Sequence, residues 1–378
     1  MTTDEPNSIA AAFAERSYRP GQGAALHLWT PVARLTGQFF RVGPEQARSN
    51  RDDVLAGVPT GQPMPLTGAR TQWLTVPRGP SGLYFLQLSA PGGKLGYAPF
   101  VLRPSRPGTA RVAVVLPTNT WQAYNFRGCD TWYCDPHYNG VDLTRPFLHR
   151  GVPPHFRGYD RGFVRWLEHT GKHPDFLADD DLERMSGDEL ARLYDLIVFS
   201  GHDEYATPHV WDAIARYRDL GGNLAFLSAN DFFYRVVRKG HRLFRTGHWY
   251  DAGRSDAGLI GAGYVGWFKN VYRNRPYTVT GAALAPWLFR GTGVRNGDTF
   301  GNYGIEIDQR TAGSPPGTQV LARIPNEFGP GKSAEMTYYT TPNGAKVFSA
   351  GVINFGGSAE QPVVSRLLAN LWRHLSRP

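Results

Sequence analysis

The stretch Leu196–Tyr205, which reads LIVFSGHDEY, decides the fold of this 378-residue chain. Its first four residues are all apolar, as in a strand that is buried on both faces of a parallel sheet. Thr207 and Pro208 follow and predict a helix, because threonine caps helix N-termini and proline is favoured in the first turn. Ligands of open α/β sheets bind beyond the carboxyl ends of the strands, which is where this stretch places His202 and Glu204. The alternative is that both are solvated loop residues beside a helix N-terminus that favours acids.

Two more predicted strands also end in polar loops. Val112–Leu116 leads into NTWQAYN at positions 119–125, and Asn223–Leu227 leads into SAND at 228–231. If these strands flank the first one in a parallel sheet, all three loops open on one rim. The side chains predicted to meet there are Tyr124, His202, Glu204 and Asn230. Each has another interpretation, since aromatic residues are usually core and an asparagine after a strand is usually a turn residue.

The chain divides into two predicted domains. Residues 1 to about 20 have the pattern of a helical lead-in, and short strands separated by Gly/Pro turns follow, so we predict a small β-sandwich over residues 1–105. Beyond a Pro-rich linker, strands alternate with helices. This predicts a mostly parallel, doubly wound α/β domain over residues 106–378, with a glutamine-amidotransferase-like sheet. A Gly-rich, irregular insert at about 240–335 is too long for a plain connection and is expected to cover the site.

Composition excludes several classes of function. The 41 basic and 32 acidic residues leave a net charge of +9, but the arginines are scattered and no nucleic-acid-binding motif is present, so no nucleic-acid partner is expected. The N-terminus carries Asp4 and Glu5 and no long apolar run, so no signal peptide or membrane partner is predicted, and a cytoplasmic location is expected. Cys129 and Cys134 lack further soft ligands for zinc and are predicted to be reduced thiols near the site, not nucleophiles. The run GAGYVG at 261–266 matches a dinucleotide fingerprint, but no apolar strand precedes it.

Four motifs resemble the large subunit of the N,N-dimethylformamidase family. They are NTWQAYN at 119–125, GHDEY at 201–205, LSAN at 227–230 and SGLY at 81–84. Members of that family are understood to hydrolyse amides with a mononuclear ferric ion that is held by two tyrosines and one glutamate. The family's large subunit is much longer than this chain and works with a small subunit. The resemblance therefore bears on the site more than on the substrate, and the need for a small partner subunit stays open.

The resemblance implies specific roles for five residues. Tyr84, Tyr124 and Glu204 would bind the Fe³⁺, and His202 and Asn230 would be the catalytic polar groups beside it. Two phenolates and a carboxylate are hard, anionic oxygen ligands whose summed charge neutralises a trivalent ion. His202 would take a proton from water and return it to the leaving amine, while Asn230 would orient the substrate or stabilise the oxyanion. The alternative proton-transfer groups are His137, His149 and His155, in the loop after Tyr124.

The sequence therefore predicts an iron-dependent amidohydrolase that acts on a neutral N-substituted amide or formamide. Several aromatic residues lie near the predicted site, and they form either an apolar wall around it or part of the ordinary hydrophobic core. They are Trp121, Phe126, Trp132, Tyr133, Phe232 and Phe233. A wall without a charged anchor would disfavour glutamine, whose charges would lose water without gaining partners. The alternatives are a metal-free hydrolase or a carbohydrate-active enzyme on the same scaffold, and a non-catalytic binding module. The sequence does not fix the oligomeric state, and a homo-oligomer is compatible with it.

Overall fold

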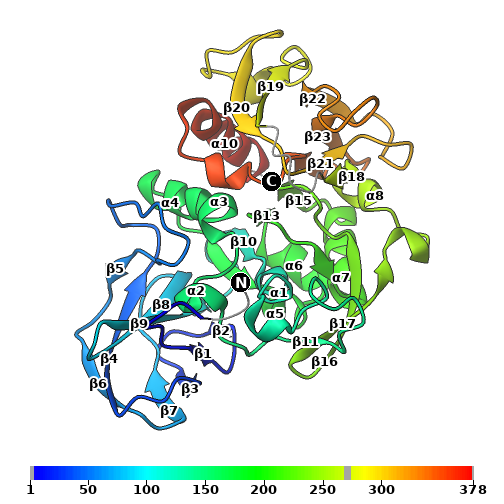
Figure 1. Cartoon of the computed structure of the whole chain (residues 1–378). Coiled ribbons are helices and arrows are strands. Elements are labelled where there is room, and N and C mark those ends of the chain that lie inside the picture. Colours follow the sequence, from blue (N-terminus) through cyan, green and yellow to red (C-terminus); the bar gives the residue numbers. More distant parts are fainter. Residues whose placement is uncertain (1–3, 268–273, 377–378) are drawn as a thin grey trace.

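The computed structural model describes residues 4–267 and 274–376. At its centre is a nine-stranded mixed sheet (Figure 1), in the order β12-β10-β13-β15-β24-β23-β22-β19-β20. The first five strands are parallel: β12 (Asp175–Ala178), β10 (Val112–Leu116), β13 (Leu196–Phe199), β15 (Asn223–Phe226) and β24 (Lys346–Ser349). The other four are antiparallel: β23 (Ala334–Thr340), β22 (Gln319–Ile324), β19 (Arg275–Val279) and β20 (Thr299–Tyr303).

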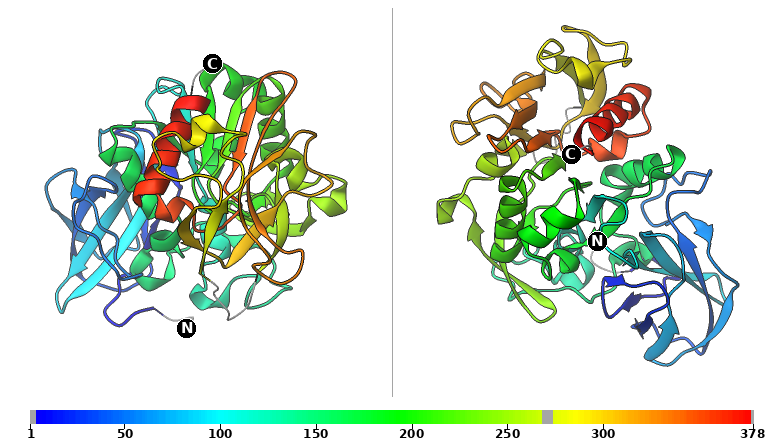
Figure 2. Two further views of the ribbon diagram at one scale, coloured as in Figure 1. Left: turned by 90° about the horizontal axis from the view of Figure 1, so that it is seen from above. Right: turned by 180° about the vertical axis from the view of Figure 1, so that it is seen from behind.

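Apolar runs form the parallel strands, and helices cover both faces. Every residue of β10 and β13 is buried, and Val114 and Val115 of β10 belong to two different hydrophobic clusters on opposite faces. The helices of the first face are α4 (Arg161–His169) and α10 (Pro362–Leu375), and those of the second are α6 (Gly187–Leu193) and α7 (Pro208–Asp219). In the left view of Figure 2, α10 in red lies on one side of the sheet, opposite the bright green helices α6 and α7. The predicted cap of α7 is confirmed, since Thr207 Oγ1 accepts a hydrogen bond from Val210 N at 3.2 Å.

The prediction of an α/β protein with N-terminal β-structure is confirmed, but the large sheet is mixed, not mostly parallel. Three of its antiparallel strands, β19, β20 and β22, come from residues 240–335, which the sequence predicts to be irregular. These strands are only five or six residues long, and glycine-rich turns surround them. Such short segments carry little periodicity of their own, so their strand structure depends on pairing with β23 and with one another.

The N-terminal part forms two sheets, which make up the blue lobe of Figure 1. One consists of β1 (Ala11–Phe13), β3 (Gly23–Leu28) and β7 (Thr71–Thr75). The other consists of β2 (Ser17–Tyr18), β9 (Lys94–Leu102), β8 (Gly82–Ala90), β4 (Arg34–Arg41) and β5 (Val58–Pro59), with β6 (Met64–Thr67) also paired to β4. Side chains of both sheets, among them Phe13, Leu26 and Phe100, share one hydrophobic cluster. The division at residue 105 stays a prediction.

The predicted helical lead-in before residue 20 is wrong. Ala11–Phe13 pairs with β3, and Ser17–Tyr18 pairs with the end of β9. Alanine favours helices, but Ala11 and Phe13 are buried in the N-terminal cluster while Ala12 between them is less so. Burial against neighbouring strands has therefore overridden the local propensity.

Shorter elements complete the chain. The remaining α-helices are α1 (Thr118–Ala123), α2 (Leu148–Gly151), α3 (Phe156–Tyr159), α5 (Asp179–Leu182), α8 (Asp256–Ile260) and α9 (Pro286–Phe289), and the 3₁₀ turns are η1 (Arg127–Cys129), η2 (Tyr250–Ala252) and η3 (Gly356–Ser358). Two small sheets contain β11 (Val141–Asp142), β17 (Arg242–His248), β16 (Tyr234–Lys239) and β14 (Tyr205–Ala206), and β18 (Gly263–Trp267) with β21 (Glu306–Gln309). In the described part of the chain, no helix has the length and apolar character needed to cross a membrane.

Candidate active site

The three predicted loops meet at one rim of the sheet, because β10, β13 and β15 are parallel neighbours. Tyr124 ends α1 after β10, His202 and Glu204 follow β13, and Asn230 follows β15. Glu204 links all three loops. Its backbone N–H donates to Thr120 Oγ1 at 3.0 Å, and its Oε1 accepts a hydrogen bond from Asn230 Nδ2 at 3.1 Å. His202, Glu204 and Asn230 are 5%, 3% and 3% exposed, so the cluster lies inside the protein.

A second tyrosine stands beside Glu204, and it is Tyr133. Its hydroxyl donates to Glu204 Oε2 at 2.9 Å and lies 2.7 Å from the hydroxyl of Tyr205. Its ring is 4.3 Å from the ring of Tyr124, measured between centroids. Tyr133 as a whole residue is 39% exposed, but its hydroxyl points inward at the carboxylate. From the sequence, Tyr133 is expected only as part of an apolar wall.

The structure does not bring Tyr84 to this cluster. Tyr84 lies on β8, is fully buried among the N-terminal strands, and packs its ring against Phe100 at a centroid distance of 6.0 Å. Its hydroxyl donates to the carbonyl oxygen of Pro80 at 2.9 Å, and burial raises its pKa to about 12. The ligand role that the resemblance implies for Tyr84 therefore does not fit its position. The phenol near Glu204 is supplied by Tyr133 instead.

Glu306 is a site residue that the sequence prediction missed. It begins β21, and its Oε2 accepts a hydrogen bond from Asn230 Nδ2 at 2.6 Å. His202 Nε2 lies 3.9 Å from this oxygen and 3.7 Å from Glu204 Oε2. The preceding residue, Ile305, has a φ of 74°, which is rare for a β-branched side chain. A signal was present in the sequence, since Glu306 and Asp308 alternate with isoleucines as strand residues of one face do.

Burial dominates the electrostatics of the cluster. It raises the pKa of Glu204 to about 7, although hydrogen bonds from Tyr124, Tyr133 and Asn230 act in the opposite direction. It also raises the pKa of Glu306 well above its usual range, and the nearby charge of Glu204 adds to this. The same loss of water lowers the pKa of His202 to about 3, so its imidazole is neutral. In the described part of the chain, His202 Nε2 has no hydrogen-bond partner, and the carboxylate oxygens of Glu204 and Glu306 lie just beyond hydrogen-bond distance of it.

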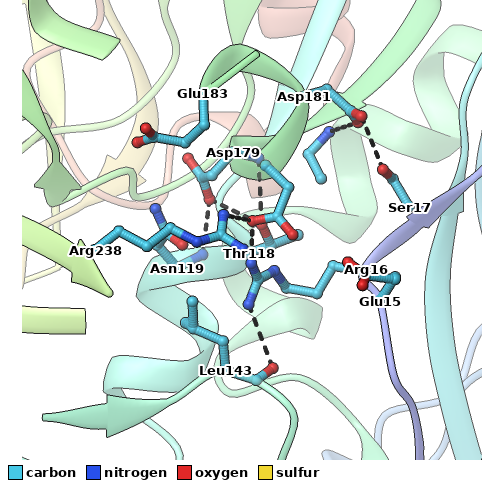
Figure 3. A network of polar contacts seen from close by, with 12 residues as sticks. Glu15, Arg16, Ser17, Thr118, Asn119, Leu143, Asp179, Asp181, Glu183 and Arg238 are labelled. Atoms are coloured by element: carbon cyan, nitrogen blue, oxygen red, sulfur yellow. Dashed lines mark hydrogen bonds and ion pairs between the residues drawn. The ribbon is translucent and has the colours of Figure 1, made fainter. Parts of the chain in front are cut away.

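A polar network anchors α1, the helix whose C-cap residue is Tyr124 (Figure 3). The Asp179 carboxylate of α5 accepts hydrogen bonds from Thr118 Oγ1 at 2.9 Å and from the backbone N–H of Asn119 at 2.7 Å. The next residue of α5, Asp180, is paired with Arg16 of the N-terminal region and with Arg238 of β16. Buried charge-assisted hydrogen bonds of this kind fix geometry more than they add stability.

Cys129 and Cys134 form a disulfide, so the prediction of reduced thiols is wrong. The 3₁₀ turn η1 and a backbone hydrogen bond from Cys134 N to Thr131 O fold the loop back on itself and bring the two sulfurs together. Tyr133 lies within the closed loop, one residue before Cys134. Disulfides are typical of oxidising compartments, which weighs against the expected cytoplasmic location.

Only part of the predicted aromatic wall faces a cavity. Phe126 and Trp121 line pockets beside Tyr124. Trp132 and Phe232 are instead packed in hydrophobic clusters, and Phe233 stacks near His248. Of the alternative proton-transfer histidines, His149 and His155 line the larger pocket, while His137 is exposed. Their roles stay predictions.

The residues at the rim fit a hard cation. Among the described residues, no group of three or more His, Cys, Asp or Glu side chains could hold a metal ion, so phenol oxygens would have to contribute. Tyr124, Tyr133 and Glu204 supply two phenols and a carboxylate in a buried setting. Oxygen donors of this kind suit a hard, highly charged metal ion better than zinc. Only a strong Lewis acid would displace the phenol protons, since burial raises the pKa of both tyrosines well above the ordinary value.

The chain is similar to known proteins over most of its length. The family described as N,N-dimethylformamidase beta subunit-like, C-terminal, matches residues 69–365. The N,N-dimethylformamidase beta subunit of Paracoccus aminophilus is 23% identical over 75% of this chain and 50% of its own length. That of an Alcaligenes species is 25% identical over 58% of this chain and 37% of its own. This chain therefore spans half or less of the length of these curated relatives.

A solved structure titled mmIFT52 N-terminal domain has a TM-score of 0.38 and 11% identity, and the match covers 57% of this chain and 90% of that chain. So weak a similarity carries no argument. By its match over most of its length, the chain belongs to the N,N-dimethylformamidase beta subunit-like family.

Proposed function

We propose that this protein is an iron-dependent amide hydrolase, in which Tyr124, Tyr133 and Glu204 hold one Fe³⁺. The observation that carries the proposal is the buried carboxylate of Glu204, which accepts a hydrogen bond from Tyr133, whose ring lies against that of Tyr124. Family membership and the curated N,N-dimethylformamidase relatives support amide hydrolysis.

The chain's own groups have separate tasks in hydrolysis. Bound iron would polarise the amide carbonyl and lower the pKa of a water molecule. In this proposal His202 accepts the proton of the attacking water at Nε2, which has no hydrogen-bond partner among the described residues, and returns it to the nitrogen as the C–N bond breaks. Asn230 donates from Nδ2 to Glu204 and Glu306, so it orients these two carboxylates. Its Oδ1 has no hydrogen-bond partner among the residues that the structure describes, and it would accept a donor from the substrate.

The substrate in this proposal is a small, neutral N-substituted amide or formamide, not glutamine. The parallel half of the sheet would be arranged as in glutamine amidotransferases, but likeness of fold implies no glutaminase activity. The cluster adds carboxylates at Glu204 and Glu306, and in the described part of the chain neither is paired with a lysine or an arginine, which disfavours a zwitterion. The proposal includes no nucleic-acid or membrane partner. If the chain forms a homo-oligomer or binds a small partner subunit, the site would still be made by the residues named above.

Metal content and colour test the proposal. Iron-loaded wild-type protein should contain one iron per chain and absorb visible light, because tyrosinate-to-ferric charge transfer is coloured. Glu204→Ala should lose the iron, and Tyr133→Phe should lose the metal or shift the band.

Tyr84→Phe is the matched control, since Tyr84 is a buried tyrosine outside the cluster. It should keep both iron and colour. Colourless, iron-free wild-type protein that still hydrolyses amides would support a metal-free hydrolase, and protein without iron or activity would support a binding module. Loss of colour in Tyr84→Phe but not in Tyr133→Phe would return the ligand role to Tyr84.

A further inference from the structure

A large cavity adjoins the candidate active site. Its volume is about 550 Å³, within the range of about 300–1,000 Å³ that is typical of pockets for drug-sized ligands. Tyr124 forms part of its wall, and so does Ile305, the residue before Glu306. The smallest N-substituted amides would fill only a fraction of this space.

The part of the cavity nearest to the site is aromatic. Tyr124, His155 and Tyr159 line both this cavity and a small pocket of about 10 Å³ that reaches His202. The rings of Tyr124 and His155 meet edge to face at 5.9 Å, and those of His155 and Tyr159 stack at 5.1 Å. Phe126 adds a further ring to the wall. An aromatic group of a substrate would meet rings that favour stacked and edge-to-face contacts.

The charged groups of the cavity wall are already paired with each other or with neighbours. Arg157 Nε lies 2.5 Å from Asp52 Oδ1, and its Nη2 lies 3.3 Å from Asp52 Oδ2. His149 Nδ1 lies 2.9 Å from Glu5 Oε1. A charged substrate would have to break one of these pairs to gain a partner, whereas a neutral substrate would leave them intact.

We propose that this cavity receives an aromatic substituent, so that the substrates are neutral amides that carry an aromatic group beside the scissile C–N bond. This inference rests on the proposed hydrolase function, because Tyr124 is both a wall of the cavity and a proposed iron ligand. The cavity holds the ring, and the amide reaches the rim where His202 and Glu204 lie.

Gly158→Trp provides the test. Gly158 lines the cavity, and nothing lies within 4 Å of the position that its Cβ would take, so a tryptophan can fill the space without a clash at its base. Gly61→Trp is the matched control, because Gly61 is exposed in the N-terminal part and its Cβ would also meet open space. Both variants are compared with the wild type by thermal melting to establish that they fold.

Two probes are used, N-benzylformamide and N,N-dimethylformamide, in binding by calorimetry and in hydrolysis. The wild type and Gly61→Trp should favour N-benzylformamide by about tenfold or more in Kd and in kcat/KM, since even one methylene in an apolar pocket is worth about 10–200-fold. Gly158→Trp should bring the ratio towards one. Phe126→Ala, which removes a ring from the wall, should reduce the ratio and serves as the second variant if Gly158→Trp does not fold.

The outcomes separate the two proposals. Binding of N-benzylformamide that Gly158→Trp abolishes, without hydrolysis of either amide, supports the cavity and contradicts the hydrolase function. Hydrolysis of both amides at equal kcat/KM, unchanged by Gly158→Trp or Phe126→Ala, supports the hydrolase function and overturns the cavity assignment.

Discussion

The Cys129–Cys134 disulfide should matter more for the active site than for the fold. The double substitution Cys129→Ser, Cys134→Ser opens a loop whose ends are five residues apart in sequence. For so short a loop, chain entropy gives about 2 kcal/mol of stabilisation. We therefore expect a loss of about 2 kcal/mol or less in the free energy of unfolding, which urea unfolding followed by tryptophan fluorescence would measure.

The effect on Tyr133 should be larger, because the disulfide closes the loop that carries this residue. The residue as a whole is 39% exposed, and its loop and the ring of Tyr124 together keep the hydroxyl 2.9 Å from Glu204 Oε2. In the double-serine variant, hydrogen–deuterium exchange over residues 127–138 should rise, and iron affinity should fall. Wild-type protein treated with dithiothreitol should behave in the same way. A variant that loses stability but keeps both slow exchange and wild-type iron affinity would refute the reasoning, because Tyr133 would then be positioned without the disulfide.

Two further substitutions test the rim. His202→Ala should keep the fold and the iron while kcat falls by about 10²–10⁴-fold, the usual cost of losing a general base; near-normal turnover would move the role to His149 or His155. Asp160→Asn tests a buried carboxyl beside the small pocket, whose pKa burial raises to about 8. The folded protein keeps a proton on Asp160 that the unfolded chain releases above about pH 4, so this group's contribution to stability is full below that pH and is lost as the pH rises towards 8. The free energy of unfolding is measured in urea from pH 5 to 8 for both proteins. The value for Asp160→Asn minus the value for the wild type should rise by up to about 1.4 kcal/mol per pH unit, and a difference that does not change with pH would contradict this.

The contacts at the rim that the sequence predicts are those that follow from local pattern. Apolar runs, interrupted only by Asn223 at the start of β15, identify β10, β13 and β15 as buried parallel strands, and the capping residues of α7 fix where the loop after β13 ends. Once neighbouring parallel strands are placed in one sheet, their carboxyl ends share a rim by geometry alone. Tyr124, Glu204 and Asn230 come together for that reason.

The parts that the sequence did not predict depend on contacts between distant segments. Tyr133 reaches Glu204 across 71 residues of sequence, and Glu306 reaches Asn230 across 76. Glu306 also lies on β21, within a Gly-rich segment whose short strands have no clear pattern until they pair. No local rule assigns either residue to the rim, although the alternation of Glu306 and Asp308 indicates that they share a face.

The choice between Tyr84 and Tyr133 as the second tyrosine is a question of energy. Tyr84 lies in the middle of its sheet, since β8 pairs with β4 on one side and with β9 on the other. To reach Glu204, its side chain would have to leave the N-terminal core and give up its hydrogen bond to Pro80. A tyrosine buries about 150–250 Å², so exposing it would cost about 4–6 kcal/mol before any strand pairing is lost. Tyr133 already places its hydroxyl on the carboxylate, so metal binding there requires the loss of protons and no rearrangement of the fold. The colour of Tyr84→Phe and Tyr133→Phe therefore distinguishes a site that is already assembled from one that must be built at the expense of the N-terminal core.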